Sequence, residues 1–213
     1  MNGEWVPGPR DSLLNSLRTG LELYRDGVRV SGGSRQPPQV SDLNDSLDLG
    51  LPIIAEDLGM ITEEVHALRR RHELPGMKVL QFMLPGEAWD NTRGEDFEPN
   101  SVVYTGTHDN DTSLGWFRAE MLPDHEKLDR LRRYVPCEES QFAWEFIEFA
   151  WRSGSNIAIA PLQDVFSLDS SARMNTPGTS GGAMTNWQWK YSPGMLTDDL
   201  KVRLAELTRV SGR

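Results

Sequence analysis

The chain has 213 residues, 38% of them hydrophobic, which is enough to build one sizeable folded domain or two smaller ones. Its formal net charge of −10 argues against a nucleic acid or an anionic membrane as a partner, and it suits a neutral ligand or a protein. The apolar runs are too short for a membrane span, and the first ten residues resemble no signal or transit peptide. The single cysteine, Cys137, excludes an internal disulfide.

The first fifty residues are expected to form two segments that precede the main folded region. The stretch DSLLNSLRTGLEL begins at Asp11 and predicts a helix, so residues 1–20 are expected to be a helical segment leading into that region. Residues 21–50 are rich in Ser, Gly, Pro and Asp and have no apolar period, which predicts an exposed polar loop or insertion. Residues 51–213 are expected to form the folded region itself.

Alternating strand and helix patterns follow from residue 51 onward. Four segments are almost continuously apolar, as is typical of parallel strands covered on both faces: 51–56, 77–82, 101–106 and 156–162. Four helical patterns lie between and after them, over 61–76, 123–135, 138–154 and 197–212. We expect Thr62 and Thr197 as N-caps, Pro123 in a first turn and Gly154 as a C-cap. The alternation predicts an α/β fold with a parallel sheet.

Polar side chains follow each predicted strand at its carboxyl end. They are Glu56–Asp57, Gln81, the run from His108 to Asp111, and Gln163–Asp164. Parallel strands bring these ends to one side of the sheet, where α/β proteins carry their chemistry. The repetition of the arrangement after four separate strands predicts a functional site there.

Three interpretations of the run from His108 to Asp111 remain open on residue types alone. The first is an ordinary turn in which Asp111 or Thr112 caps the next helix. The second is a metal site, which is less favoured because His108 and Asp109 would diverge on an extended backbone and no other histidine follows a strand. The third is acid–base chemistry between Glu56 and Asp109, of the kind that glycoside chemistry requires.

Seven tryptophans are scattered along the chain. Burial is the usual role of large aromatic side chains, so we expect most of them in the core or at interfaces. Aromatic faces also stack on sugar rings, which keeps a ligand-binding role open for a minority.

Several motifs together resemble the 4-α-glucanotransferases of the amylomaltase or disproportionating-enzyme family, glycoside hydrolase family 77. The resemblance covers residues 3–18 and 51–197, and it rests on LPIIAEDLGMITEEV, LPGMKVLQF, NSVVYTGTHDNDTSLGW, IAPLQDV and ARMNTPGT. It implies a (β/α)8 barrel with insertions and a retaining double displacement on α-1,4-glucans or maltooligosaccharides, without a cofactor or a metal.

The resemblance also implies roles for four residues. Glu56 matches the family's general acid/base, which protonates the glycosidic oxygen and then deprotonates the incoming hydroxyl. Asp109 matches the third carboxylate, which holds ring hydroxyls as the oxocarbenium-like state forms. His108 and Asn175 match contacts to sugar hydroxyls.

One family motif is missing from the chain. The family's nucleophile is an aspartate in an Arg-x-Asp-His segment upstream of GEWVPGP, and the sequence contains no such segment. Asp57 is no substitute, since it should point away from the face that carries Glu56. A complete barrel takes about 250 residues, so we expect the C-terminal half only, with four parallel strand–helix units that correspond to strands five to eight.

A half barrel of this kind has consequences for activity and partners. The missing N-terminal half would have to come from another chain or from a longer protein, and the isolated chain is expected to be inactive. The alternative is a non-catalytic glucan-binding or regulatory remnant of the same fold, and a metal hydrolase is the weakest option. We expect a cytoplasmic protein, or a plastid one if an upstream transit peptide exists.

Overall fold

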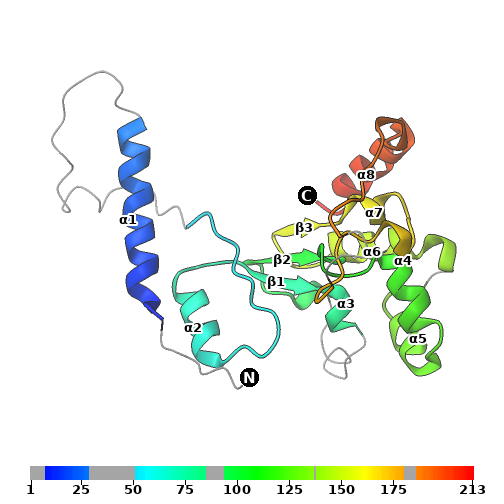
Figure 1. The fold of residues 1–213 in the computed structure, drawn as a ribbon, viewed down its shortest axis with the longest axis horizontal. Helices are drawn as coiled ribbons and strands as arrows, with labels where there is room; N and C mark the ends of the chain where they lie inside the picture. Colours follow the sequence, from blue (N-terminus) through cyan, green and yellow to red (C-terminus); the bar gives the residue numbers. More distant parts are fainter. Residues whose placement is uncertain (1–7, 29–50, 85–93, 137, 180–185) are drawn as a thin grey trace. The chain divides into compact units, whose positions relative to one another are not determined.

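The computed structural model describes residues 8–28, 51–84, 94–136, 138–179 and 186–213, and Figure 1 gives their fold. The chain divides into two compact units, one up to Gly76 and one from Met77 to Arg213.

The first unit contains two helices, α1 (Arg10–Val28) and α2 (Glu63–Arg71). Helix α1 continues past the predicted end at residue 20, and the rest of the predicted loop, 29–50, lies outside the described residues. The two helices are joined through Asp11, whose carboxylate accepts hydrogen bonds from Arg71 Nη1 at 2.8 and 2.9 Å and lies 2.8 Å from Nε2 of the buried His72. Hydrogen bonds from His72 and Arg71 lower the pKa of Asp11 below its usual value.

The expected strand over 51–56 is not formed, so that prediction is wrong for the described chain. A strand requires a ladder of hydrogen bonds to a neighbour. Among the described residues, one backbone hydrogen bond links 51–56 to the stretch after α2, from Ala55 N to Pro75 O at 2.8 Å. Ile53 and Ile54 are accordingly exposed by 36% and 44%.

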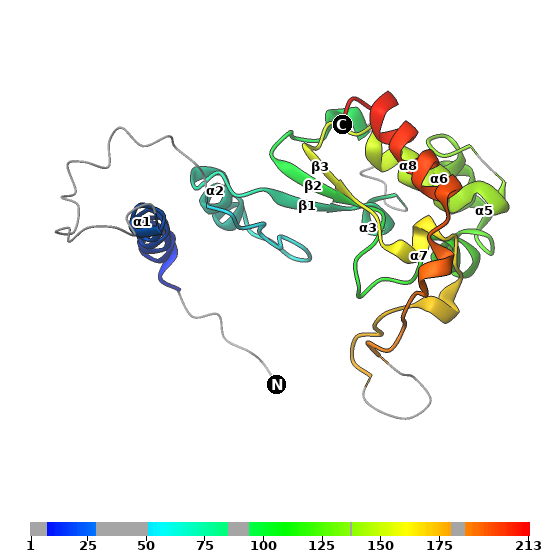
Figure 2. The same cartoon turned by 90° about the horizontal axis from the view of Figure 1, so that it is seen from above.

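Three short strands form the sheet of the second unit: β1 (Gly76–Val79), β2 (Ser101–Tyr104) and β3 (Ile157–Ile159), in the order β1-β2-β3. Strands β2 and β3 are parallel, with Val102 opposite Ile157, and the three arrows lie side by side in Figures 1 and 2. Each strand is shorter than predicted: α3 (Leu80–Met83) begins directly after β1, a bend and loop follow β2, and α7 (Leu162–Val165) begins soon after β3.

The prediction that the strands are buried on both faces is confirmed for β2 and wrong for β3. Val102 and Val103 are fully buried, whereas Ile157 and Ile159 are exposed by 43% and 40%. Strand β3 lies at an edge of the sheet, so the face that carries both isoleucines has no cover from the described residues.

Among the described residues of the second unit, four longer helical elements follow or pack against the sheet. They are α4 (Ser113–Trp116), which continues as a π-helical turn over Phe117–Met121, then α5 (His125–Arg132), α6 (Phe142–Trp151) and α8 (Asp198–Val210). Thr197 caps α8 as predicted, and its side chain accepts from Leu200 N. At α5 the cap is Asp124 rather than a first-turn Pro123, because the Asp124 carboxylate accepts from two backbone N–H groups. Thr62 occupies the N-cap position of α2 without a side-chain hydrogen bond.

Helix α6 carries the apolar core. Phe142 stacks on Phe117 with ring centroids 4.2 Å apart and on Phe146 at 5.1 Å, and Trp116 lies 5.6 Å from Phe146. A second cluster joins α6, α7 and α8 through four buried side chains, namely Trp144, Ile147, Val165 and Leu207. Figure 2 shows α6 and α8 side by side.

Gly154 is needed for close approach rather than as the predicted helix cap. Helix α6 ends at Trp151 with Arg152 as its C-cap. A side chain at position 154 would lie 2.6 Å from the carbonyl oxygen of Glu95 and 2.7 Å from that of Phe97. The glycine therefore allows the loop after α6 to pack against the segment before β2.

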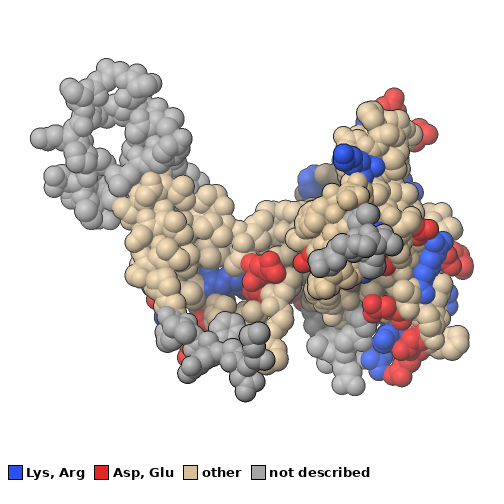
Figure 3. All heavy atoms as spheres, viewed as in Figure 1, with Lys and Arg blue, Asp and Glu red and all other residues tan. Residues whose placement is uncertain are grey.

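Acidic and basic side chains are interspersed on the face drawn in Figure 3, most visibly over α5. Two i,i+3 and i,i+4 pairs contribute there, Lys127 with Asp124 at 3.6 Å and Arg130 with Glu126 at 2.5 Å. No helix within the described residues is long and apolar enough to cross a membrane.

Candidate active site

The loop after β2 folds into a tight turn that brings His108 and Asp109 together. The Asn110 side chain closes the turn, because its Oδ1 accepts from Thr107 N at 2.9 Å and from Thr107 Oγ1 at 2.8 Å. His108 Nε2 then lies 3.4 Å from Asp109 Oδ1. The expectation that these neighbours diverge is therefore wrong, since the backbone at 108–109 is a turn and not an extended strand.

Asn175 reaches the same carboxylate from a distant part of the sequence. Its Nδ2 donates to Asp109 Oδ1 at 2.5 Å. No hydrogen bond from the described residues reaches the second oxygen, Oδ2. Three of the four site residues expected from the sequence thus lie in direct contact, with one carboxylate oxygen left to accept from a ligand.

Arg173 fixes the two segments of this cluster through their main chains. Its Nη2 donates to the carbonyl oxygen of Asp109 at 2.7 Å, and its Nε donates to the carbonyl oxygen of Asn175 at 2.8 Å. Sequence reasoning missed Arg173, although the motif ARMNTPGT contains it. The available signal was a basic side chain two positions from a candidate site residue.

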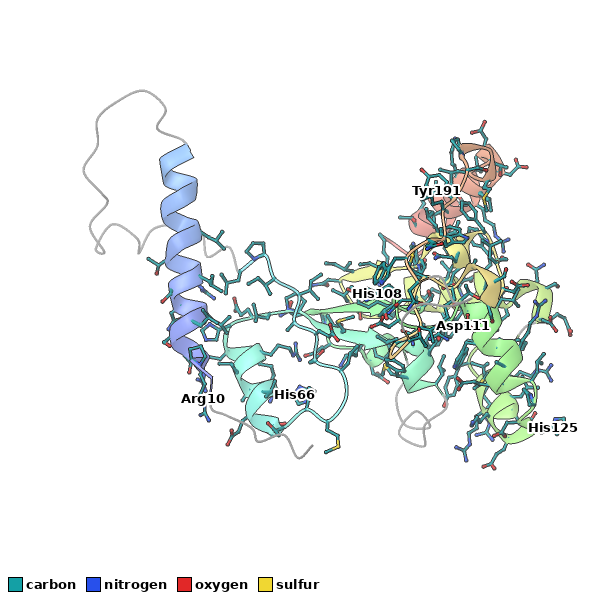
Figure 4. The ribbon with its side chains drawn as sticks, viewed as in Figure 1. Arg10, His66, His108, Asp111, His125 and Tyr191 are labelled. Atoms are coloured by element: carbon teal, nitrogen blue, oxygen red, sulfur yellow. The ribbon has the colours of Figure 1, made fainter. Side chains whose placement is uncertain are left out.

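An open pocket of about 160 Å³ lies beside the cluster. Its lining comes from the ends of β2 and β3 and from the segment after α7: Thr107, His108, Asn110, Asp111, Thr112, Pro161, Gln163, Arg173, Met174 and Trp187. Figure 4 shows His108 and Asp111 beyond the strand ends, with Tyr191 further away towards α8. The sequence predicted polar groups at this edge, but it did not single out Trp187.

A buried carboxylate holds both ends of the loop that carries the cluster. Asp164 Oδ2 accepts from Thr105 Oγ1 at 2.6 Å and from Ser113 Oγ at 2.7 Å, and its Oδ1 accepts from Ser113 N at 2.7 Å. Burial raises the pKa of Asp164 and the negative charge of Asp111 adds to this, while the hydrogen bonds act in the opposite direction. Asp164 is thus a structural group rather than an exposed strand-end residue.

Thr112 is the N-cap of α4, as the first of the three interpretations allowed, and the Asp111 side chain holds the backbone of Thr112. Thr112 Oγ1 accepts from Gly115 N at 3.0 Å and so caps α4. Asp111 Oδ1 accepts from Thr112 N at 2.8 Å, and its Oδ2 accepts from Ser170 Oγ at 2.6 Å. The two ends of this run therefore have different roles. His108 and Asp109 belong to the surface cluster, and Asp111 holds the start of α4.

Glu56 lies in the unit that ends at Gly76, where its side chain is exposed. Its neighbour Asp57 is buried instead: the Asp57 side chain is 5% exposed and lies 3.2 Å from Arg69 Nε. Over the described ranges of both units, no three His, Cys, Asp or Glu side chains gather as a metal site would require.

The parallel sheet and the pocket at its carboxyl ends define an α/β protein of the kind that carries its chemistry at that edge. A family model described as 4-alpha-glucanotransferase matches residues 1–197. The chain belongs to the 4-alpha-glucanotransferase family.

Individual relatives extend over the whole chain. The 4-alpha-glucanotransferases of Thermus thermophilus and of Synechocystis are 42% and 41% identical to it, and each alignment covers 100% of this chain but 38% and 36% of the relative. The solved amylomaltase from Streptococcus agalactiae, in complex with acarbose, is 27% identical with a TM-score of 0.75, over 99% of this chain and 36% of that one. The chain thus spans little more than a third of the length of these relatives.

Proposed function

We propose that residues 51–213 are the C-terminal half of the catalytic (β/α)8 barrel of a 4-α-glucanotransferase. In this proposal β1 to β3 correspond to strands six to eight, and 51–56, which forms no strand here, precedes them in the sequence position of strand five, with residues 1–20 leading into the half barrel and 21–50 inserted before it. The exposed isoleucines of β3, Ile157 and Ile159, support the proposal, because an apolar strand face needs cover from further parts of a barrel. The remaining barrel half is the partner that would supply them.

The proposed reaction is transfer of α-1,4-glucan segments between maltooligosaccharides by a retaining double displacement. Glu56 would protonate the leaving oxygen, and an aspartate in an Arg-x-Asp-His segment on the other barrel half would attack the anomeric carbon. Glu56 would then remove the proton from the acceptor hydroxyl, whose oxygen would attack the anomeric carbon and release the aspartate. The 213-residue chain alone would not turn over, since its sequence contains no such segment.

The Asp109 cluster is the observation that carries this proposal. One oxygen of the carboxylate is fixed by Asn175, and the other is open to accept from a sugar hydroxyl. His108 lies alongside on the wall of the pocket. A fixed carboxylate with one open oxygen is suited to bind ring hydroxyls while positive charge develops on the sugar.

A complementation assay with maltotriose tests the proposal. The chain is mixed with a polypeptide that carries the remaining barrel of the Thermus thermophilus relative, and longer and shorter oligosaccharides are measured. We expect products from the mixture and none from either part alone. Asp109→Asn and Glu56→Gln should each reduce the rate at least about 100-fold, whereas Asp129→Asn and Glu64→Gln, at exposed positions, should not. Turnover by the chain alone, or full activity of Asp109→Asn, would overturn the proposal.

The second candidate is a non-catalytic glucan-binding or regulatory remnant, which the missing Arg-x-Asp-His segment favours. It predicts maltooligosaccharide binding without turnover in every mixture.

As to location, we propose the cytoplasm, because several relatives are bacterial, with the plastid as the alternative because the rice relative is named chloroplastic/amyloplastic.

A further inference from the structure

Trp187 is exposed, whereas the other tryptophans among the described residues are buried or half-buried. Its side chain is 61% exposed, against 4% for Trp116 and 6% for Trp144. An indole ring costs free energy to leave in water, so exposed tryptophans beside a pocket commonly mark a binding surface. Trp187 forms part of the wall of the pocket next to the Asp109 cluster.

The backbone at Trp187 is held in an unfavourable conformation. Its φ of +64° lies in the left-handed region, which a bulky side chain rarely adopts. Such a conformation persists only where surrounding contacts impose it, and it is commonest at functional sites.

The surrounding contacts tie Trp187 to the segment that carries Asn175. Trp187 N donates to the carbonyl oxygen of Met174 at 2.7 Å. The adjacent Asn186 accepts from Thr176 N at 3.0 Å through Oδ1, and its Nδ2 donates to Thr179 Oγ1 at 3.0 Å. The hydrogen bonds thus join Trp187 and its neighbour to residues directly before and after Asn175.

The indole ring lies beside one of the candidate hydroxyl-binding groups, His108. Its centroid lies 5.0 Å from that of the His108 ring, at an interplanar angle of 39°. A glucose ring has an apolar face of C–H bonds and a polar edge of hydroxyls. An aromatic face next to polar side chains matches both parts of such a ring.

We propose that Trp187 is the platform on which one glucose ring of the glucan stacks while its hydroxyls bind the His108–Asp109–Asn175 cluster. This deepens the proposed function and rests on it. The strained backbone would be retained because it holds the indole ring in the pocket, and the cost would fall on the stability of the fold.

Binding of maltoheptaose to the 213-residue chain, measured by titration calorimetry, tests this role. Trp187→Ala should weaken binding roughly fivefold to tenfold, while Trp187→Phe should retain most of the affinity. Tyr191→Ala is the matched control, because Tyr191 is also aromatic and 48% exposed but lies outside the pocket lining. It should bind as the wild type does.

Thermal unfolding of Trp187→Gly separates binding from a structural role. Glycine accepts a left-handed backbone without strain, so the melting temperature of this variant should equal or exceed that of the wild type, while maltoheptaose binding is weakened about as much as in Trp187→Ala. A clear fall in melting temperature would make Trp187 a structural residue and overturn the inference.

The binding outcomes distinguish this inference from the proposed function. Unchanged affinity in Trp187→Ala, together with a loss in Asp109→Asn, overturns the platform and leaves the proposed function standing. A wild-type chain that binds no maltoheptaose also overturns the platform, and the maltotriose complementation assay then decides the proposed function by itself.

Discussion

Removing the Asp164 carboxylate should loosen the loop that carries the Asp109 cluster. Asp164 is 1% exposed, and its partners Thr105 and Ser113 are fully buried. In Asp164→Ala the backbone N–H of Ser113 loses its acceptor, at a cost of about 1 to 3 kcal/mol for a buried unsatisfied donor. The two hydroxyls can reorient and add less, so the free energy of unfolding should fall by about 3 kcal/mol in total.

Asp164→Asn provides a matched comparison of similar shape. The amide oxygen can still accept from Ser113 N, while the amide nitrogen donates to the hydroxyls, so the cost should be about 1 kcal/mol. Urea unfolding followed by tryptophan fluorescence measures both variants. A loss below about 1 kcal/mol in Asp164→Ala, or equal losses in the two variants, would refute the role assigned to these hydrogen bonds.

The pH dependence of stability gives a second comparison of the wild type with Asp164→Asn. Burial raises the pKa of Asp164 above 3.8, its usual value. The stability advantage of the wild type over Asp164→Asn should therefore be complete below that value and decline as pH rises through the folded-state pKa. Melting temperatures of the two proteins from pH 4 to pH 7 should converge with increasing pH, and a difference that widened instead would contradict the assigned direction.

Three further changes test other parts of the structure. Phe146→Ala should reduce the free energy of unfolding by about 3 to 5 kcal/mol, because this fully buried ring stacks in the α6 core, while Val202→Ala, 67% exposed, should be nearly neutral; similar losses would contradict the burial. Thr112→Ala should lower the free energy of unfolding by about 1 kcal/mol in urea, and Thr112→Ser, which keeps the hydroxyl, should lose much less; equal losses in the two variants would contradict the capping role. Arg173→Lys should weaken maltoheptaose binding in calorimetry with little change in melting temperature, since one ammonium cannot reach both carbonyl groups; unchanged binding would remove Arg173 from the site.

The sequence predicted helices better than strands in this chain. Helix α8 begins after Thr197 as expected because its cap, its apolar stripe and its acidic first turn are all local features. Strands depend on partners that the local sequence does not specify, so 51–56 has strand-like composition and no strand, and β3 is exposed on the face where burial was expected.

The candidate site was predictable in part for the same reason. The sequence picked out His108, Asp109 and Asn175, which the structure brings into contact. It did not single out Arg173, whose only signal was its place two positions before Asn175, or Trp187, because the importance of both comes from hydrogen bonds and exposure that only the folded loops create.

Arg173 binds backbone oxygen atoms of the two loops. The loops are therefore held in place whichever side chains they carry at positions 109 and 175. A substitution at position 109 or 175 changes what a ligand meets but leaves the carbonyl groups that the guanidinium holds. The backbone arrangement of the two loops should therefore persist when these side chains are replaced. For the experimenter this means that Asp109→Asn should change chemistry in an unaltered setting, so a lost activity can be assigned to the missing negative charge.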